Sequence, residues 1–284
     1  MKRLSEHVFL LAESPRFQNG GVTFTDIDEK KLYRWENGEV KMIWDKAQIT
    51  AFIFDRNGGM VFANMEGLYR MRADGTYYPL AEGLKINDMG VDPAGRVLFG
   101  TNYHSREQSY PLGSLYSYDK ENGLRELEYG YHLANGIGFS PDGTKLYVCD
   151  SSLRCVFEYP YDVKTGEIGR KRILIRMRMD DGMPDGMAID EAGNVWTAQW
   201  YGRCVICTSP EGKELRRVAV PEAEVSAVEF TPQGLFITSS GKAGRLDIAP
   251  AAFSVDDPQV TGGVYLADAG VRGPAHALSD IPCK

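Results

Sequence analysis

The sequence predicts an all-β fold, a six-bladed β-propeller, and three observations support this expectation. A turn that ends in glycine recurs six times along the 284 residues. Two short runs rich in β-branched and aromatic residues follow each of these turns. No long segment shows the 3.6-residue periodicity of an amphipathic helix, so we expect little helix. A two-strand unit that recurs in this way is typical of propeller blades.

The turns combine Asp, Asn or Pro with a glycine, the chemistry of tight hairpins. They occupy residues 18–21, 55–59, 92–95, 140–143, 190–193 and 231–234. Their glycines, at 20, 58, 95, 143, 193 and 234, lie 38, 37, 48, 50 and 41 residues apart. Propeller blades repeat at about 40 to 50 residues. An irregular β-sandwich is the alternative, but its turns recur every 8 to 12 residues or so without a longer period.

Two strands are expected after each turn. The first strands are predicted at 22–25, 60–63, 97–100, 145–148, 195–198 and 235–238. The second strands are predicted at 32–35, 68–71, 115–118, 156–159, 205–208 and 264–267. We expect the ring to close by pairing of about residues 4–12 with a C-terminal strand. The whole chain, 1–284, is then one domain.

The composition narrows the class of protein. The chain is 43% hydrophobic and 25% charged, with a formal net charge of -7 and a pI near 5.3. This balance argues against a nucleic-acid surface, which normally carries a basic patch. No apolar run approaches the roughly 18 residues of a membrane span, and the start of the chain shows no export signal. We therefore expect no membrane or nucleic-acid partner, and a cytoplasmic protein that is a monomer or a small homo-oligomer.

Two of the five cysteines, Cys204 and Cys207, have the CxxC spacing of some zinc and redox sites. The segment around them is predicted to be a β-strand, in which residues three apart point to opposite faces. The two thiols would not converge. We therefore interpret both as buried structural residues.

Polar residues stand at matching points of the repeat, shortly before its turns. The segments that carry them are 11–17, 85–92, 133–139 and 183–190. Because blades place equivalent residues around one axis, Asn87, Asn135 and Asp185 are predicted to lie at equivalent places there. Carboxylates and an amide oxygen suit Ca²⁺, Mg²⁺, Mn²⁺ or Zn²⁺. Taken singly, Asn-Gly and Asp-Gly steps are mainly turn formers, so that interpretation stays open. The four histidines lack metal-type spacing, which argues against a His-based zinc site.

Four groups of motifs then occur in order along the chain. They lie at 13–17 with 24–27 and 32–35, at 87–88 with 92–96, at 135–137 with 139–143, and at 184–187 with 190 and 193–196. In this combination the chain resembles the SMP-30/gluconolactonase/LRE-like family, which includes regucalcin and bacterial sugar lactonases. The resemblance runs from about residue 10 to 240 and more weakly beyond.

The resemblance implies a six-bladed propeller with one axial divalent cation. It implies Glu13, Asn135 and Asp185 as metal ligands and Asn87 as a substrate contact. It also implies Asp185 as the general base. One departure is Lys85, where several sugar lactonases carry Arg, and a lysine offers a point charge in place of a planar fork.

The polar loop 101–110 offers His104 and Arg106 as further substrate contacts, together with Lys85; a solvated loop is the alternative interpretation. The function predicted is metal-dependent hydrolysis of a gluconolactone-like sugar lactone to its aldonic acid. No GxSxG nucleophile motif is present. Two alternatives stay open: a hydrolase of other esters, lactones or organophosphates on the same site, and a non-catalytic metal-binding propeller.

Overall fold

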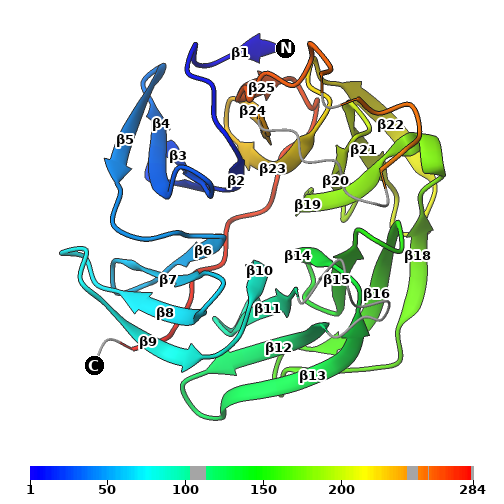
Figure 1. The fold of residues 1–284 in the computed structure, drawn as a ribbon. Coiled ribbons are helices and arrows are strands. Elements are labelled where there is room, and N and C mark those ends of the chain that lie inside the picture. The colour runs from blue at the N-terminus through cyan, green and yellow to red at the C-terminus, as the bar shows by residue number, and fades with distance from the viewer. Residues whose placement is uncertain (103–112, 242–248, 255, 283–284) are drawn as a thin grey trace.

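Six antiparallel sheets stand around a central axis, like the blades of a propeller (Figure 1). The structure is a computed structural model and describes residues 1–102, 113–241, 249–254 and 256–282. The predicted all-β, six-bladed propeller is confirmed. Within the described residues, no helix has the length and apolar character needed to cross a membrane.

The first three blades follow one another along the chain, and each begins at the axis and ends at the rim. Blade 1 contains β2 (Ala12–Gln18), β3 (Gly21–Asp26), β4 (Lys31–Glu36) and β5 (Glu39–Trp44). Blade 2 contains β6 (Ala51–Phe54), β7 (Met60–Ala63), β8 (Gly67–Met71) and β9 (Tyr77–Glu82). Blade 3 contains β10 (Ile86–Val91), β11 (Val97–Thr101), β12 (Gly113–Asp119) and β13 (Gly123–Tyr131).

The last three blades add an extra strand, a short helix and the ring closure. Blade 4 contains β14 (Ala134–Phe139), β15 (Lys145–Asp150), β16 (Cys155–Asp162) and β18 (Arg172–Arg176), with β17 (Glu167–Ile168) paired to the end of β16. The 3₁₀-helix η1 (Met179–Asp181) precedes blade 5, which contains β19 (Met183–Ile189), β20 (Val195–Trp200), β21 (Cys204–Thr208) and β22 (Glu214–Ala219). Blade 6 contains β23 (Val225–Thr231), β24 (Gly234–Ser239), β25 (Tyr265–Ala267) and β1 (Lys2–Arg3).

The N-terminus closes the ring, over a range that differs in part from the predicted one. The strand that pairs with β25 is β1, Lys2–Arg3, and of the predicted residues 4–12, Leu11 forms an isolated antiparallel bridge with Ser240. Those residues still run beside the C-terminal part of blade 6, since the amide of Phe9 donates to the carbonyl of Gly262 at 2.9 Å.

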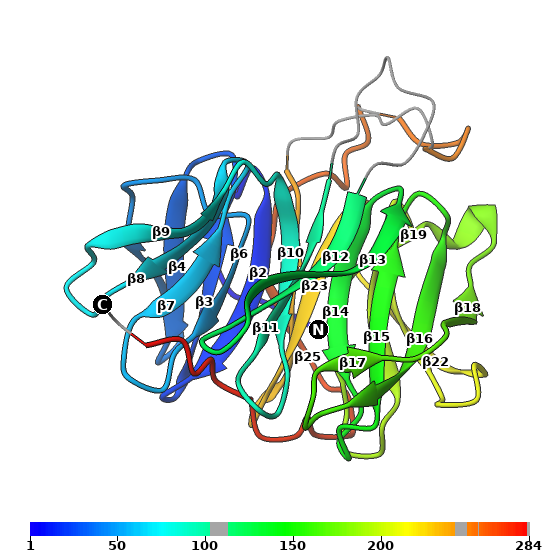
Figure 2. The ribbon, with the colours of Figure 1, turned by 90° about the horizontal axis from the view of Figure 1, so that it is seen from below.

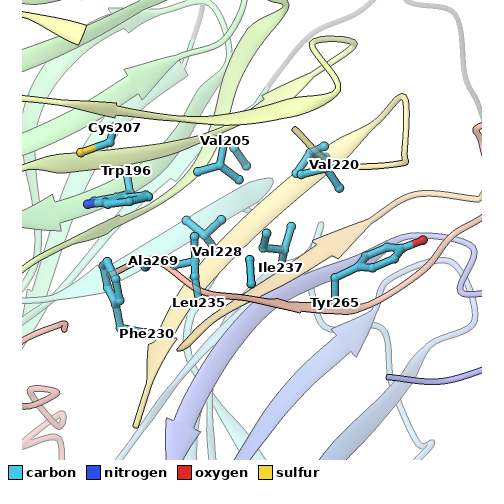
Figure 3. Packing of buried hydrophobic residues seen from close by; sticks show 13 residues of the cluster. Trp196, Val205, Cys207, Val220, Val228, Phe230, Leu235, Ile237, Tyr265 and Ala269 are labelled. Carbon is cyan, nitrogen blue, oxygen red and sulfur yellow. The ribbon is translucent and has the colours of Figure 1, made fainter. Parts of the chain in front are cut away.

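The apolar core lies between neighbouring blades. Six clusters of buried side chains each join two adjacent blades, and Figure 3 shows the one between blades 5 and 6 around Trp196 and Phe230. Cys204 and Cys207 are buried in two different clusters, on opposite faces of β21. The structural interpretation of this CxxC pair therefore holds.

The C-terminal segment crosses the axis at one end of the ring (Figures 1 and 2). The amide of Ser279 donates to the carbonyl of Phe54 at 2.9 Å, and its hydroxyl donates to Asp55 at 2.7 Å. Ile281 is buried against blades 2 and 3. At the other end, residues 249–254 and 256–262 rise beyond the blades (Figure 2).

Candidate functional site

A cavity of about 260 Å³ lies on the axis at the end away from the C-terminal segment. The starts of inner strands and the ends of the strands next to them form its walls, because antiparallel neighbours meet there. Its lining residues are Leu11, Glu13, Ile27, Asn87, Asp88, Asn102, Leu133, Asn135, Ser151, Ser152, Met183, Asp185 and Trp200. The cavity thus has a polar floor and a partly apolar rim.

The sequence-predicted residues from the repeat come together here. Glu13, Asn87, Asn135 and Asp185 line this one cavity from blades 1, 3, 4 and 5. Glu13, Asn87 and Asn135 each come one residue after the first paired residue of their inner strand, and Asp185 comes two residues after Met183, the first paired residue of β19. Their predicted convergence around the axis is therefore confirmed, while their chemical roles are a separate question.

A β-bulge follows at that point in each of these inner strands. The pairing register shifts between Glu13 and Arg16 in β2, and between Ala134 and Ile137 in β14. Strands β10 and β19 carry the same irregularity at Ile86/Asp88 and Pro184/Met187. A bulge twists the strand and re-aims side chains, and bulges are frequent beside functional sites.

The Asn-Gly and Asp-Gly steps are not turns. Gly136 and Gly186 lie inside β14 and β19, with ordinary negative φ angles or extended backbone. A Cβ built on Gly136 would lie 2.5 Å from the carbonyl oxygen of Asp185. Glycine is therefore required so that the inner strands can approach closely at the axis, and the turn interpretation is wrong at these two positions.

Three carboxylates, those of Glu13, Asp88 and Asp185, share the floor of the cavity, and the nearby Arg16 guanidinium offsets their repulsion only in part. Burial, and then the Asp88 carboxylate, raise the pKa of Glu13 to about 8. Burial, followed by Glu13 and Asp88, raises the pKa of Asp185 well above its usual value. Burial also raises the pKa of Asp88, and the Arg16 guanidinium opposes that rise. A bound divalent cation would relieve this repulsion.

Hydrogen bonds orient the amides. Asn135 donates from Nδ2 to the Ser151 hydroxyl at 3.1 Å, so its Oδ1 is the atom left to act as a ligand. Asn87 donates from Nδ2 to the carbonyl of Ala134 at 3.1 Å, which likewise leaves its Oδ1 as an acceptor. The floor can therefore offer oxygen atoms from two amides and from carboxylates.

These donors fit a hard divalent cation. Two carboxylates and one amide oxygen, from Glu13, Asp185 and Asn135, give the predicted ligand set. Over the described residues, no group of three or more His, Cys, Asp or Glu side chains has the arrangement of a metal site. The fit therefore depends on the amide as the third ligand.

The predicted substrate contacts divide into three cases. Asn87 lines the cavity. Lys85 is exposed and is not among the lining residues. His104 and Arg106 lie outside the described residues. Asp88, Ser151 and Trp200 also line the cavity and were assigned no role from the sequence. The positions of Ser151 and Trp200 follow from hairpin register, which the residue pattern alone does not reveal.

The fold and this cavity define a class of protein, the six-bladed propellers with a polar site on the axis. This chain belongs to the SMP-30/gluconolactonase/LRE-like family, whose profile, described as the SMP-30/Gluconolactonase/LRE-like region, matches residues 11–241.

Three relatives illustrate the family. The pentonolactonase XacC of Haloferax volcanii is 28% identical over 267 residues, which cover 91% of this chain and 90% of that protein. The L-arabinolactonase of Azospirillum brasilense is 37% identical over 194 residues, covering 68% of this chain and 63% of that protein. The crystal structure of the calcium-binding protein regucalcin from Agrobacterium tumefaciens has a TM-score of 0.84 and 25% identity, with 98% of this chain and 97% of that chain covered.

Proposed function

We propose that this protein is a lactonase that depends on one divalent cation and opens a sugar lactone to its aldonic acid. The observation that carries the proposal is the meeting of Glu13, Asn135 and Asp185, from three blades, on the floor of one axial cavity. Two relatives named as pentose-type lactonases support the substrate class. A relative described as calcium-binding supports the cation, for which Ca²⁺, Zn²⁺, Mn²⁺ and Mg²⁺ are the candidates.

Four residues of the floor, Glu13, Asn87, Asn135 and Asp185, have roles in the proposed reaction. A divalent cation, when bound, polarises the lactone carbonyl and makes a water molecule more acidic. Glu13, Asn135 and Asp185 would hold that cation through two carboxylates and an amide oxygen. Asn87 accepts a hydrogen bond from a substrate hydroxyl through Oδ1, because its Nδ2 is already engaged by Ala134.

Asp185 handles the proton. As the water oxygen bonds to the carbonyl carbon, Asp185 takes the proton that the water releases. The bond from the carbonyl carbon to the ring oxygen then breaks, and the proton passes to that oxygen. The products are a carboxylic acid and a free hydroxyl, so atoms and protons balance. An aspartate is a weak base by itself, which is why the water must already be acidified.

An acid-release assay tests this function. Gluconolactone and pentonolactones are followed with a pH indicator, against a blank for spontaneous hydrolysis. We expect activity above the blank, its loss in EDTA, and its return when a divalent cation is added back. Full activity after complete removal of metal would contradict the metal's role, and the absence of any stoichiometric divalent ion would favour a non-catalytic propeller.

The apolar rim supports a second candidate substrate class. Leu11, Ile27, Leu133, Met183 and Trp200 line the cavity and could receive a less polar ester or lactone. The same assay distinguishes the two classes when γ-butyrolactone and an aryl ester are included. A higher kcat/KM for these compounds than for every sugar lactone would favour the second candidate.

A further inference from the structure

Side chains of one blade donate hydrogen bonds to the backbone of the next blade, just before its cavity residue. In four places, a side-chain donor reaches the carbonyl oxygen immediately before a floor residue. The pairs are Ser226 Oγ to Ala12 at 2.6 Å, Thr50 Oγ1 to Ile86 at 2.8 Å, Asn87 Nδ2 to Ala134 at 3.1 Å and Ser151 Oγ to Pro184 at 2.6 Å. The residues after these carbonyls are Glu13, Asn87, Asn135 and Asp185. We call these four hydrogen bonds the axial belt.

The belt acts where the sheets themselves are interrupted. Ile86, Ala134 and Pro184 are the last residues paired in register before the bulges of their strands. A bulge disrupts the ladder locally, so a bond from the neighbouring blade is well placed to fix the peptide there. The donors Ser226, Thr50 and Ser151 are buried, with at most 2% of their surface exposed, so water competes little for these bonds.

Ser151 has two contacts at once. Its hydroxyl accepts from Asn135 Nδ2 at 3.1 Å and donates to the carbonyl of Pro184 at 2.6 Å. A hydroxyl can do both, since it has one proton and two lone pairs. One side chain therefore orients the amide of Asn135 and fixes the peptide that leads into Asp185.

The backbone around Ser151 is held as well. Its amide donates to the carbonyl of Leu133 at 3.0 Å. The carboxylate of Asp150 accepts from the amide of His132 at 2.9 Å. These bonds attach the end of β15 to the entry of β14, so the Ser151 hydroxyl has little freedom to move away from Asn135.

We propose that Ser151 is a positioning residue that sets the geometry of two cation ligands, Asn135 and Asp185, and that the axial belt extends the same function to the other floor residues. This inference rests on the proposed cation site. Outer-shell hydrogen bonds of this kind are worth about 10- to 100-fold in metal affinity.

Calorimetric titration of the metal-free, full-length protein with CaCl₂ and with MnCl₂ tests the inference. Ser151→Ala removes both contacts, while Ser151→Thr keeps the hydroxyl. Ser239→Ala is the matched control, because Ser239 is also buried and donates to a backbone carbonyl, that of Gly263 at 2.7 Å, away from the cavity. Circular dichroism and the Tm of each metal-free variant report folding.

We expect Ser151→Ala to weaken cation binding about 10-fold or more, with Ser151→Thr and Ser239→Ala close to the unmodified protein. If Ser151→Ala does not fold, Ser226→Ala replaces it, since it removes the belt bond before Glu13 and carries the same expectation. Unchanged affinity in a folded Ser151→Ala or Ser226→Ala protein overturns the inference alone. An unmodified protein that binds no divalent cation overturns the inference and the proposed cation site together.

Discussion

At the scale of residues, the floor of the cavity brings acidic groups together, and their repulsion lowers the stability of the metal-free protein. Asp88 and Asp185 are buried, Glu13 beside them is partly buried, and burial together with mutual repulsion raises the pKa values of these carboxyl groups. Such clustering is uncommon in sites that serve stability alone and is frequent in functional sites. These carboxylates therefore destabilise the metal-free protein, while the proposed reaction requires them.

The first prediction concerns Asp185→Asn, which keeps the shape of the side chain and removes its charge. The amide cannot take the proton from water, so kcat should fall about 100-fold or more. The Tm measured in EDTA should rise, because a repelled, buried charge has been removed. Lactone kinetics and thermal unfolding check both effects, with the exposed Glu39→Gln as a control. A variant that retains half of its kcat would rule out the role of Asp185 as base.

The second prediction concerns pH. Because the pKa of Glu13 is raised from 4.5 to about 8 in the folded protein, the folded chain binds more protons than the unfolded chain within that window. The free energy of unfolding of the metal-free protein should therefore fall as pH rises between these values. Asp88 and Asp185 act in the same direction.

Thermal unfolding at pH 5.5 and pH 8, in EDTA and in CaCl₂, measures this effect. The Tm in EDTA should be lower at pH 8, and added CaCl₂ should raise the Tm more at pH 8 than at pH 5.5. Equal CaCl₂ shifts at both pH values would show that the carboxylates do not bind the cation as ionised groups.

The residues that the sequence predicted correctly at the cavity are those marked by the repeat. Asn87, Asn135 and Asp185 were found because they recur at one point of the blade, and Glu13 gained its place from the family resemblance. Ser151 directly follows β15 and Trp200 is the last residue of β20, and only the hairpin register shows that both line the cavity. Lys85 directly precedes β10 yet is exposed, since sequence proximity does not fix side-chain direction.

At the scale of elements, inner strands were harder to predict than the strands outside them. The predicted strands 22–25 and 145–148 lie within β3 and β15. They could be predicted because the repeat period and the preceding turn residues mark where they begin. The inner strands β14 and β19 contain Asn-Gly and Asp-Gly, which in most proteins indicate a turn. Here Gly136 and Gly186 are required because the inner strands approach closely at the axis. No local sequence pattern encodes that approach.

Gly136→Ala tests this explanation. The added Cβ would meet the carbonyl oxygen of Asp185 at 2.5 Å and the amide nitrogen of Met187 at 2.9 Å. Backbone atoms cannot move aside cheaply, so we expect a loss of about 1–3 kcal/mol in the free energy of unfolding and weaker cation binding. Urea unfolding and calorimetry measure the two quantities. Unchanged values for both would mean that strand spacing at Gly136 is not critical.

At the scale of the whole molecule, both ends of the chain hold the ring together. Strand β1 completes blade 6, and the C-terminal segment joins blades 2 and 3 across the axis. Arg70 and Asp55 form an ion pair at 2.8 Å that is wholly buried, and Arg70 Nε donates to the carbonyl of Ile281 at 3.2 Å. The sequence could not predict this pair, because Asp55 follows β6 and Arg70 lies in β8, and only the pairing of the strands in blade 2 brings them together.

Arg70→Met should therefore destabilise the protein. It leaves the Asp55 carboxylate buried without its cation, a change that typically costs about 3–5 kcal/mol. Lys41→Met is the control, because the Lys41–Glu39 pair is exposed at 73% and 66% and such pairs contribute about 1 kcal/mol or less. Denaturant unfolding compares the two variants, and equal effects would contradict the importance of the buried pair.

The proposal as a whole depends on one cation held by ligands from three blades. Elemental analysis of the purified protein after metal loading and desalting measures this most directly, for the unmodified chain and for Glu13→Gln, Asn135→Ala and Asp185→Asn. We expect one divalent ion per chain in the unmodified protein and substoichiometric metal in each folded variant. No bound ion in the unmodified protein, or a full complement in all three variants, would contradict the proposed site.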